Sequence, residues 1–510
     1  MTRRLIFSLA AVLAVAACND QQDPTDLKSA PELVSTRGTT RINVLLKSKP
    51  TAGNRTELSK HGTIYDEIAP INVLLMRVKG DKIAAIKALP FVAGVSMDAV
   101  RDVGPIPAIE AGVEDFAAGG NVWNLDAINV TEKGTSTRQV TQTGENVYVA
   151  ILDTGLLPSW RSYFPEDRIA TQYAKAFGGG GAANNGAVPE PPNKWEKDVN
   201  SHGTHVASIV LGYQYRSAAS GPLQIAGVAP KATVIPVKVL NQNGSGWSST
   251  IAQGISYVAE LAGEDGLIEG RRVVINMSLG GSQLDMVEQL AIDHAWENNV
   301  VVVASAGNNG PEGAMGFPGG YEKVISVAAA GWVGEWDNPS PPAVPNPNCS
   351  MLNPDDALTP SRFWRQCDVP EGYDERNYYI TDFSAEENGA GATAPQDLDV
   401  AAPGSWVVGP WQEQQGTISY FFVGGTSQAS PHVAGIVALM LEKNPGLTVS
   451  AVESRLEAAA EDLNYRDQRV RPGTGGAPFV LAPVPDWGSE GQPENRAGHG
   501  FITADAALGS

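Results

Sequence analysis

The sequence predicts an α/β fold, in which a doubly wound, mostly parallel sheet forms most of the chain and follows a small α+β domain of ferredoxin-like type. Continuous apolar runs recur along the chain, and such runs are typical of strands buried on both faces of a parallel sheet. They occupy residues 147–152, 233–240, 273–278 and 301–306. Stretches with apolar residues at helical spacing lie between them. The crevice of such a sheet lies beyond the carboxyl ends of its strands, so polar side chains there are candidates for chemistry.

An apolar segment at the start of the chain indicates export. Arg3 and Arg4 precede an apolar run over residues 5–17, which is too short to span a membrane and is typical of a signal peptide. The run ends in Val-Ala-Ala-Cys, which resembles the cleavage motif of bacterial lipoproteins and predicts lipidation of Cys18. The alternative is simple cleavage that leaves a free thiol. We expect a location in the bacterial cell envelope (periplasm or outer membrane) or secretion, with membrane contact only through a lipid anchor.

Changes in composition divide the chain into segments. The expected boundaries are a signal peptide at 1–18, a polar tether at 19–40, the small domain at 41–103, a loose processing linker at 104–121 and the large domain at 122–510. A proline-rich stretch, 332–379, breaks the rhythm of the large domain and is expected to be a surface insertion. It contains Cys349 and Cys367, which in an exported protein are expected to form a disulfide rather than a metal site. The formal net charge of −20 argues against a nucleic-acid partner.

Within the small domain, strand-like and helix-like segments alternate. Residues 41–47 and 71–78 are strand-like, residues 81–89 have helical spacing, and residues 92–100 end the unit. A unit of about sixty residues can bury only a modest core.

Two side chains of the large domain are candidates for proton chemistry. Asp153 directly follows the first apolar run, where a carboxylate can orient a histidine and stabilise its charged form. The alternative role for Asp153 is a helix N-cap or a turn. His202, in the string SHGTHVA, is expected at the start of a helix. His205 lies one turn later, but no acidic residue stands between the two histidines as in zinc proteases, so we expect no metal there and a packed role for His205.

The string GGTSQASPHVAG around Ser427 precedes an apolar helical segment. Ser427 would stand at the start of that helix, where the dipole favours a nucleophile and the backbone N–H is free to bind an oxyanion. Pro431 is expected in the first turn, so the helix should start within residues 427–430. His432 is too close in sequence to fold back onto Ser427, so it and Ser430 are expected to be structural.

The order of these residues, Asp153, then His202, then Ser427, is that of subtilisin and differs from the orders in chymotrypsin and the α/β-hydrolases. The strings ILDTG, HGTHVA, INMSLGG with ASAGNNG, and GTSQASPHVAG also occur in the order found in that family. From about residue 122 onward the chain therefore resembles the subtilisin-like serine proteases (subtilases). The resemblance implies an exported serine endopeptidase that hydrolyses polypeptides through an acyl-enzyme. Ser427 would be its nucleophile, His202 its proton carrier and Asp153 the residue that orients His202.

The resemblance implies further site residues. Asn308 would donate a hydrogen bond to the oxyanion together with the Ser427 backbone N–H, while a turn asparagine is the alternative. Two glycine-containing segments would hold an extended peptide as an added strand. They comprise Ser278, Leu279 and Gly280 on one side, and Gly244, Ser245 and Gly246 on the other. Asn309 and Gly316 would line the pocket for the residue before the scissile bond, and an apolar or aromatic residue is expected there because no carboxylate is evident.

The small domain resembles the subtilisin propeptide, which implies a zymogen that cleaves itself between about residues 101 and 120 and is inhibited by its own propeptide. A permanent accessory domain is the alternative. No cofactor is expected for catalysis. The loop after residue 214 lacks the asparagine-rich pattern of the family's calcium loop, so no calcium ligands are assigned, although weaker structural calcium sites suit the acidic surface.

Two other functions are compatible with parts of the sequence. An esterase would use Ser427 with Asp462 and His499 downstream, because the surrounding Gly-Thr-Ser-Gln-Ala nearly matches the esterase nucleophile motif. That interpretation leaves ILDTG and HGTHVA unexplained. A catalytically silent binding protein of the cell envelope on a protease scaffold is the non-enzyme alternative.

Overall fold

The computed structural model describes most of both predicted domains. The described residues are 38–104, 108–111, 122–132, 137–177, 194–217, 221–310, 312–332, 378–411, 419–461, 463, 469–471, 480–482 and 494–509. Four residues singled out in the sequence, Cys18, Cys349, Cys367 and Asp462, lie outside them, as do the predicted signal peptide and residues 333–377 of the predicted insertion. Within the described part of the chain, no helix combines the length and apolar character that crossing a membrane requires.

The small domain is an antiparallel four-stranded sheet with the strand order β2-β3-β1-β4. Its elements are β1 (Thr39–Leu46), α1 (Ala52–Ser59), β2 (Gly62–Ile68), β3 (Val73–Lys79), α2 (Ile83–Lys87) and β4 (Val92–Met97). Successive side chains of β3 point to opposite faces of the sheet and so contribute to two different cores. Leu74 and Met76 pack in the interior of the small domain, while Val73 and Leu75 join the core of the large domain. Neither α1 nor β2 was predicted from the sequence; α1 buries only Leu58 and shows no apolar stripe. β1 begins inside the predicted tether.

The large domain is built on an eight-stranded sheet with the order β16-β15-β14-β13-β7-β11-β8, and β17 pairs with β15. The strands are β7 (Val147–Asp153), β8 (Lys175–Ala176), β11 (Thr233–Lys238), β13 (Arg272–Met277), β14 (Val301–Ser305), β15 (Ile325–Trp332), β16 (Tyr378–Ile380) and β17 (Val400–Pro403). Neighbours run parallel except β15 and β16. From β7 the chain moves outward to the edge strand β8, comes back through β11, and then crosses to β13 on the other side of β7. The predicted doubly wound, mostly parallel sheet is therefore confirmed.

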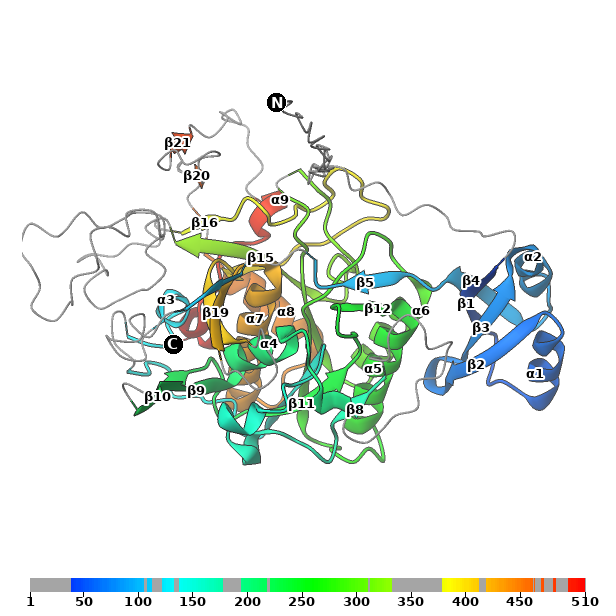
Figure 1. The fold of residues 1–510 in the computed structure, drawn as a ribbon, viewed down its shortest axis with the longest axis horizontal. Coiled ribbons are helices and arrows are strands. Elements are labelled where there is room, and N and C mark those ends of the chain that lie inside the picture. The colour runs from blue at the N-terminus through cyan, green and yellow to red at the C-terminus, as the bar shows by residue number, and fades with distance from the viewer. Residues whose placement is uncertain are drawn as a thin grey trace, which may run out of the picture.

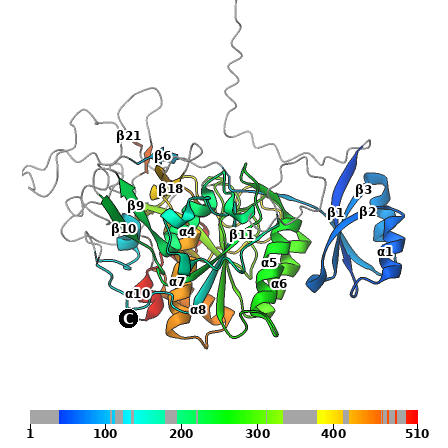
Figure 2. The same ribbon diagram turned by 60° about the horizontal axis from the view of Figure 1, so that its bottom comes forward.

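Helices cover both faces of this sheet (Figure 2). On one face lie α4 (His202–Leu211), α7 (Thr426–Lys443) and α8 (Val449–Ala459), and on the other α5 (Ser248–Ala262) and α6 (Met286–Glu297). The sheet strands are buried on both sides because each face contributes to its own apolar core. The direction of winding reverses beside β7, so the crevice is expected at the carboxyl ends of β7 and β13.

Shorter elements surround the sheet. They are β5 (Val100–Asp102), β6 (Ala108–Glu110), α3 (Trp123–Ala127), β9 (Gly212–Ser217), β10 (Gly221–Ala226), β12 (Ser245–Trp247), β18 (Val407–Trp411), β19 (Ser419–Val423), β20 (Arg469–Arg471), β21 (Val480–Ala482), α9 (Glu494–Ala497) and α10 (Ala504–Leu508). Single 3₁₀ turns occur at Ala69–Ile71, Gly80–Lys82, Trp160–Ser162, Glu166–Arg168 and Lys194–Glu196.

The small domain packs beside α5 and α6, and the chain then runs back over the large domain (Figure 1). β5 pairs with β12 of the large domain. Part of the segment predicted to be a loose linker is ordered, because β6 pairs antiparallel with β19. The linker prediction was wrong at β6, where main-chain pairing to a distant strand replaces the expected irregular chain.

Candidate active site

Asp153 and His202 form a buried pair at the carboxyl end of β7. The Nδ1 atom of His202 lies 2.9 Å from each carboxylate oxygen of Asp153, and both side chains are fully buried. Thr154 N–H donates to Oδ1 of the same carboxylate at 2.6 Å. Because Nδ1 donates its proton to the carboxylate, the lone pair of the imidazole stands on Nε2. That atom is buried and has no hydrogen-bond partner among the residues that the structure describes.

The start of α4 is held by the carboxylate of Asp198, which is not among the site residues predicted from the sequence. Asp198 accepts the N–H of Ser201 at 2.7 Å, and both the N–H and the hydroxyl of Thr204, at 3.0 and 2.7 Å. Burial raises the pKa of Asp198, although these donors oppose the shift. An acidic residue shortly before SHGTHVA was the available signal, because such residues cap helix N-termini. Asp198 thus fixes the turn of helix on which His202 stands.

The glycine beside His202 allows two backbones to approach each other. A Cβ placed on Gly203 would lie 2.4 Å from the carbonyl oxygen of Gly155. Gly155 itself has φ +100°, a conformation that other residues rarely adopt. The two glycines let α4 start directly against the end of β7, which brings His202 to Asp153.

Ser427 lies at the N-terminal end of α7, and Gly425 precedes that helix. Its hydroxyl donates to the carbonyl of Ser278 at 3.3 Å, and the Ser278 hydroxyl donates to the carbonyl of Ser427 at 2.7 Å. Ser278 follows β13, the strand next to β7. The structure therefore brings the ends of β7, β13 and α7 to one crevice, with the Ser427 hydroxyl turned toward Ser278.

The prediction that Pro431 stands in the first turn of its helix was wrong. The helix begins at Thr426, before the expected range of 427–430, so Pro431 lies in the second turn. Proline has no N–H, and the carbonyl four residues earlier is that of Ser427. This carbonyl is free to accept the hydroxyl of Ser278 instead, which compensates for the proline inside the helix.

The other residues of the GGTSQASPHVAG string and His205 have structural contacts. His432 donates from Nδ1 to the carbonyl of Gln428 at 2.7 Å and accepts from Asn124 at 2.8 Å. Ser430 donates to Asn276 at 2.6 Å. His205 bonds the carbonyl of Val407 at 3.0 Å. Burial lowers the pKa of His432 to about 4 and that of His205 to about 3, so both rings stay neutral at pH 7.

Asn308 lies between α7 and the segment that runs through the crevice. Its Oδ1 accepts both the N–H and the hydroxyl of Thr426, at 3.0 and 2.9 Å. These two bonds fix the amide plane, and they leave Nδ2 as the donor on the other side. A Cβ placed on Gly104 would lie 3.5 Å from this Nδ2. A peptide that follows the course of residues 100–104 thus passes directly in front of the Asn308 amide.

The two glycine-containing segments hold this part of the chain between them. Asp102 exchanges both backbone hydrogen bonds with Gly280, at 3.0 and 2.9 Å, and Val103 donates to the carbonyl of Gly244 at 3.1 Å. β5 is antiparallel to β12, with Arg101 opposite Gly246. Residues 100–103 therefore form a strand between the segments predicted to bind substrate, one of which includes the buried Leu279 and the other Ser245.

Gly316 lies against one of these segments, while Asn309 is more exposed. The Cα of Gly316 would lie 3.6 Å from a Cβ placed on Gly280, and Phe317 exchanges backbone hydrogen bonds with Gly281. Asn309 donates from its side chain to the carbonyl of Ala314 at 2.8 Å. Gly316 is thus well placed to form a wall beside the peptide.

Of the two downstream residues of the esterase alternative, only His499 lies in the described part of the chain. The side chain of His499 is exposed, and its backbone N–H bonds the carbonyl of Asp399. The other residue, Asp462, lies outside the described part of the chain. Among the described residues, no group of three or more His, Cys, Asp or Glu side chains is arranged to hold a metal ion.

Comparison with known proteins decides the family. The sequence profile of the subtilase family (peptidase S8) matches residues 144–500. The chain belongs to the subtilase family. The subtilases are serine endopeptidases, and this subtilase is assigned to that class of hydrolase. The matched range excludes the small domain, β5 and β6.

The relatives include well-known bacterial proteases. Subtilisin DY of Bacillus licheniformis is 32% identical over 323 residues, which cover 63% of this chain and 85% of the relative. Thermitase of Thermoactinomyces vulgaris is 29% identical over 321 residues, covering 63% of this chain and 83% of the relative. Among solved structures, fervidolysin from Fervidobacterium pennivorans, a keratinolytic enzyme related to subtilisin, superposes with a TM-score of 0.59 at 22% identity. That match covers 92% of this subtilase but 61% of fervidolysin, and it supports the fold alone.

Proposed function

We propose that this subtilase is an exported endopeptidase in which Asp153, His202 and Ser427 act as a catalytic triad. The observation that carries the proposal is the contact of 2.9 Å between Nδ1 of His202 and the Asp153 carboxylate. That contact orients the imidazole, stabilises it when it is charged and leaves the lone pair on Nε2. The contact lies at the carboxyl end of β7. In a parallel sheet of this kind, a functional site is expected at the carboxyl ends of neighbouring strands.

The chemistry proceeds in two halves. Oγ of Ser427 attacks the carbonyl carbon of the scissile bond while its proton passes to Nε2 of His202. The same proton then goes to the leaving amine, the C–N bond breaks and an ester forms on Ser427. Water repeats the sequence and releases the acid. The hydroxyl must first turn from Ser278 toward His202, and hydrogen bonds of this kind commonly form only in the substrate complex.

The oxyanion formed in each half is stabilised by Nδ2 of Asn308 and the backbone N–H of Ser427. Both are neutral donors, held in place before the reaction by the Thr426 contacts and by the start of α7. The segments around Gly244 and Gly280 hold the substrate backbone as an added strand. Polypeptides are the proposed substrates, and an apolar or aromatic residue is proposed beside Gly316 and Asn309.

Replacement of Asn308 by alanine tests the oxyanion role. We expect kcat to fall about 10²–10³-fold with little change in KM, a magnitude known from subtilisin itself rather than derived from this structure. Asn308→Asp, which keeps an acceptor for Thr426 but has no donor, should lose at least as much. Steady-state kinetics with circular dichroism to check folding make the measurement. A kcat within a few-fold of wild type in both variants would exclude this role.

The small domain and residues 100–104 are proposed to be an inhibitory propeptide. The support is their position: the segment that leaves the small domain fills the groove in front of Asn308. Self-cleavage between about residues 101 and 120 would release the domain. Export, lipidation of Cys18, a disulfide between Cys349 and Cys367, and catalysis without a cofactor complete the proposal, and structural calcium is left without assigned ligands.

A further inference from the structure

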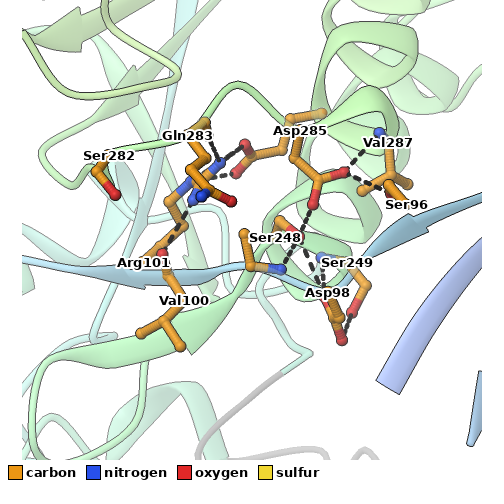
Figure 3. Close-up of polar contacts among 12 residues, drawn as sticks. Ser96, Asp98, Val100, Arg101, Ser248, Ser249, Ser282, Gln283, Asp285 and Val287 are labelled. Atoms are coloured by element: carbon orange, nitrogen blue, oxygen red, sulfur yellow. Dashed lines mark hydrogen bonds and ion pairs between the residues drawn. The ribbon is translucent and has the colours of Figure 1, made fainter. Parts of the chain in front are cut away.

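A buried ion pair joins the segment in the groove to the large domain. The side chains of Arg101 in β5 and Glu288 in α6 are each 1% exposed. Nε of the guanidinium lies 3.0 and 3.1 Å from the two Glu288 oxygens, and Nη2 lies 2.5 Å from one of them. Nη2 also donates to the carbonyl of Gln283 at 2.8 Å, and Nη1 donates to that of Val100 at 2.9 Å (Figure 3). Every guanidinium nitrogen therefore has an oxygen acceptor within the protein.

Arg101 occupies a defined place along the groove. Gly104 lies beside Asn308, so Arg101 is the fourth residue counted back from the catalytic centre. The backbone hydrogen bonds that hold this strand do not depend on side-chain identity, so any extended peptide can make them. At the fourth position, selection among peptides must come from the groups that surround the side chain.

Most of the pocket around the guanidinium belongs to the large domain. Glu288 lies in the first turn of α6, and the carbonyl of Gln283 lies in the preceding loop. A Cβ placed on Gly281 would lie 2.7 Å from Nη1 of Arg101, so this glycine leaves the room that the guanidinium occupies. These groups remain with the large domain when the segment in the groove leaves.

The pocket is built to attract a positive charge. The pKa of Glu288 is raised to about 7, because burial and, to a smaller extent, the neighbouring Asp285 and Asp98 outweigh the opposing effect of Arg101. Asp285 belongs to the large domain and caps α6, whereas Asp98 comes from the small domain. Without a cation, an ionised Glu288 would be a buried charge that lacks its partner, which is unfavourable and shifts the carboxyl toward its protonated form.

We propose that Glu288 forms the subsite for the fourth residue before the scissile bond, and that this subsite binds the guanidinium of an arginine in the substrate. Arg101 occupies the subsite in the precursor. The inference rests on the proposed function and adds a substrate preference to it. Arginine suits the site better than lysine, because its planar group can donate to both oxygens of Glu288 and to the Gln283 carbonyl together.

The preference for arginine over leucine should depend on pH, because it requires the buried Glu288 carboxyl to be ionised. Only ionised Glu288 forms the ion pair, so binding of arginine releases a proton wherever the empty pocket holds Glu288 protonated. We expect the ratio of kcat/KM for an arginine peptide to that for a leucine peptide to fall as pH is lowered from about 8.5 to about 5.5. Taking the ratio at each pH cancels the titration of the catalytic groups. A ratio that rises on acidification would contradict this prediction.

The test compares peptides that differ only at the fourth residue before the cleaved bond, which carries Arg, Lys, Leu or Glu. Protein purified after expression of the full chain is used as wild type, as Glu288→Gln and as Asp293→Asn. The last variant is a matched control, since Asp293 is another carboxylate of α6 and pairs with Lys323 instead. Active sites are titrated with a serine-reactive phosphonate, because Glu288→Gln also alters the contact with Arg101 and changes the yield of processed protein.

Wild type and Asp293→Asn are expected to prefer Arg to Leu by about 30-fold or more, and Glu288→Gln to lose most of that ratio. Equal rates for Arg and Leu in the wild type, or an unchanged ratio in Glu288→Gln, would overturn the subsite while leaving the proposed function intact. If the phosphonate labels no serine and no peptide is cleaved, both the proposed function and the subsite are overturned.

Discussion

Replacement of Ser427 by alanine is expected to lower peptide hydrolysis by about 10⁶-fold, the magnitude known from subtilisin itself. The variant has no oxygen to attack the carbonyl, and the other hydroxyls at the start of α7 are already engaged, because Thr426 donates to Asn308 and Ser430 donates to Asn276. The precursor should also stay uncut, with the small domain still attached. Kinetics and the intact mass of the purified protein make the measurement.

Ser430→Ala is the matched control for this variant. It removes the second serine of the same string and leaves Asn276 without one donor, so we expect a loss of stability of about 1–3 kcal/mol but retained turnover. Loss of activity in Ser430→Ala with full activity and normal processing in Ser427→Ala would refute the assignment of the nucleophile.

Asp153→Asn is expected to lower kcat by about 10⁴-fold, as the same change does in another serine protease. The asparagine amide would donate to His202, which would force the imidazole proton onto Nε2 and remove the lone pair that accepts the serine proton. The fold should survive, because asparagine has nearly the same shape as aspartate. It keeps one side-chain oxygen to accept the Thr154 N–H, and its amide still contacts His202. Steady-state kinetics with thermal unfolding make the measurement.

His499→Ala provides the contrast that separates this function from the esterase. The side chain of His499 is exposed, so its removal should leave peptide hydrolysis unchanged. If ester hydrolysis disappeared in His499→Ala and persisted in Asp153→Asn, the esterase with Asp462 and His499 would replace the triad proposed here.

Much of the fold could be predicted from the sequence because the relevant signals are local. The apolar run that ends at Asp153 is long and lacks alternation, which happens only where both faces of a strand are covered. The helical stripe of α5 is equally local. The missed helix α1 buries a single leucine, so it left no stripe to detect.

The expectation that Pro431 lies in the first turn of its helix failed because of a contact with a distant part of the chain. A helix interior normally excludes proline, since a carbonyl then loses its partner. Here the hydroxyl of Ser278, 149 residues away in sequence, donates to that carbonyl. No property of the α7 sequence alone reports such a donor.

Strand ends and helix starts are marked by neighbouring residues, so the amino-acid sequence was enough to predict which chemical groups the protein carries and on which elements they stand. Which of these groups come into contact depends on how the chain packs. The contact between Arg101 and Glu288 joins residues 187 positions apart, and its strength comes from burial that neither residue shows in its local sequence. Charge pairing depends on distance and on exclusion of water, and both are properties of the packed chain.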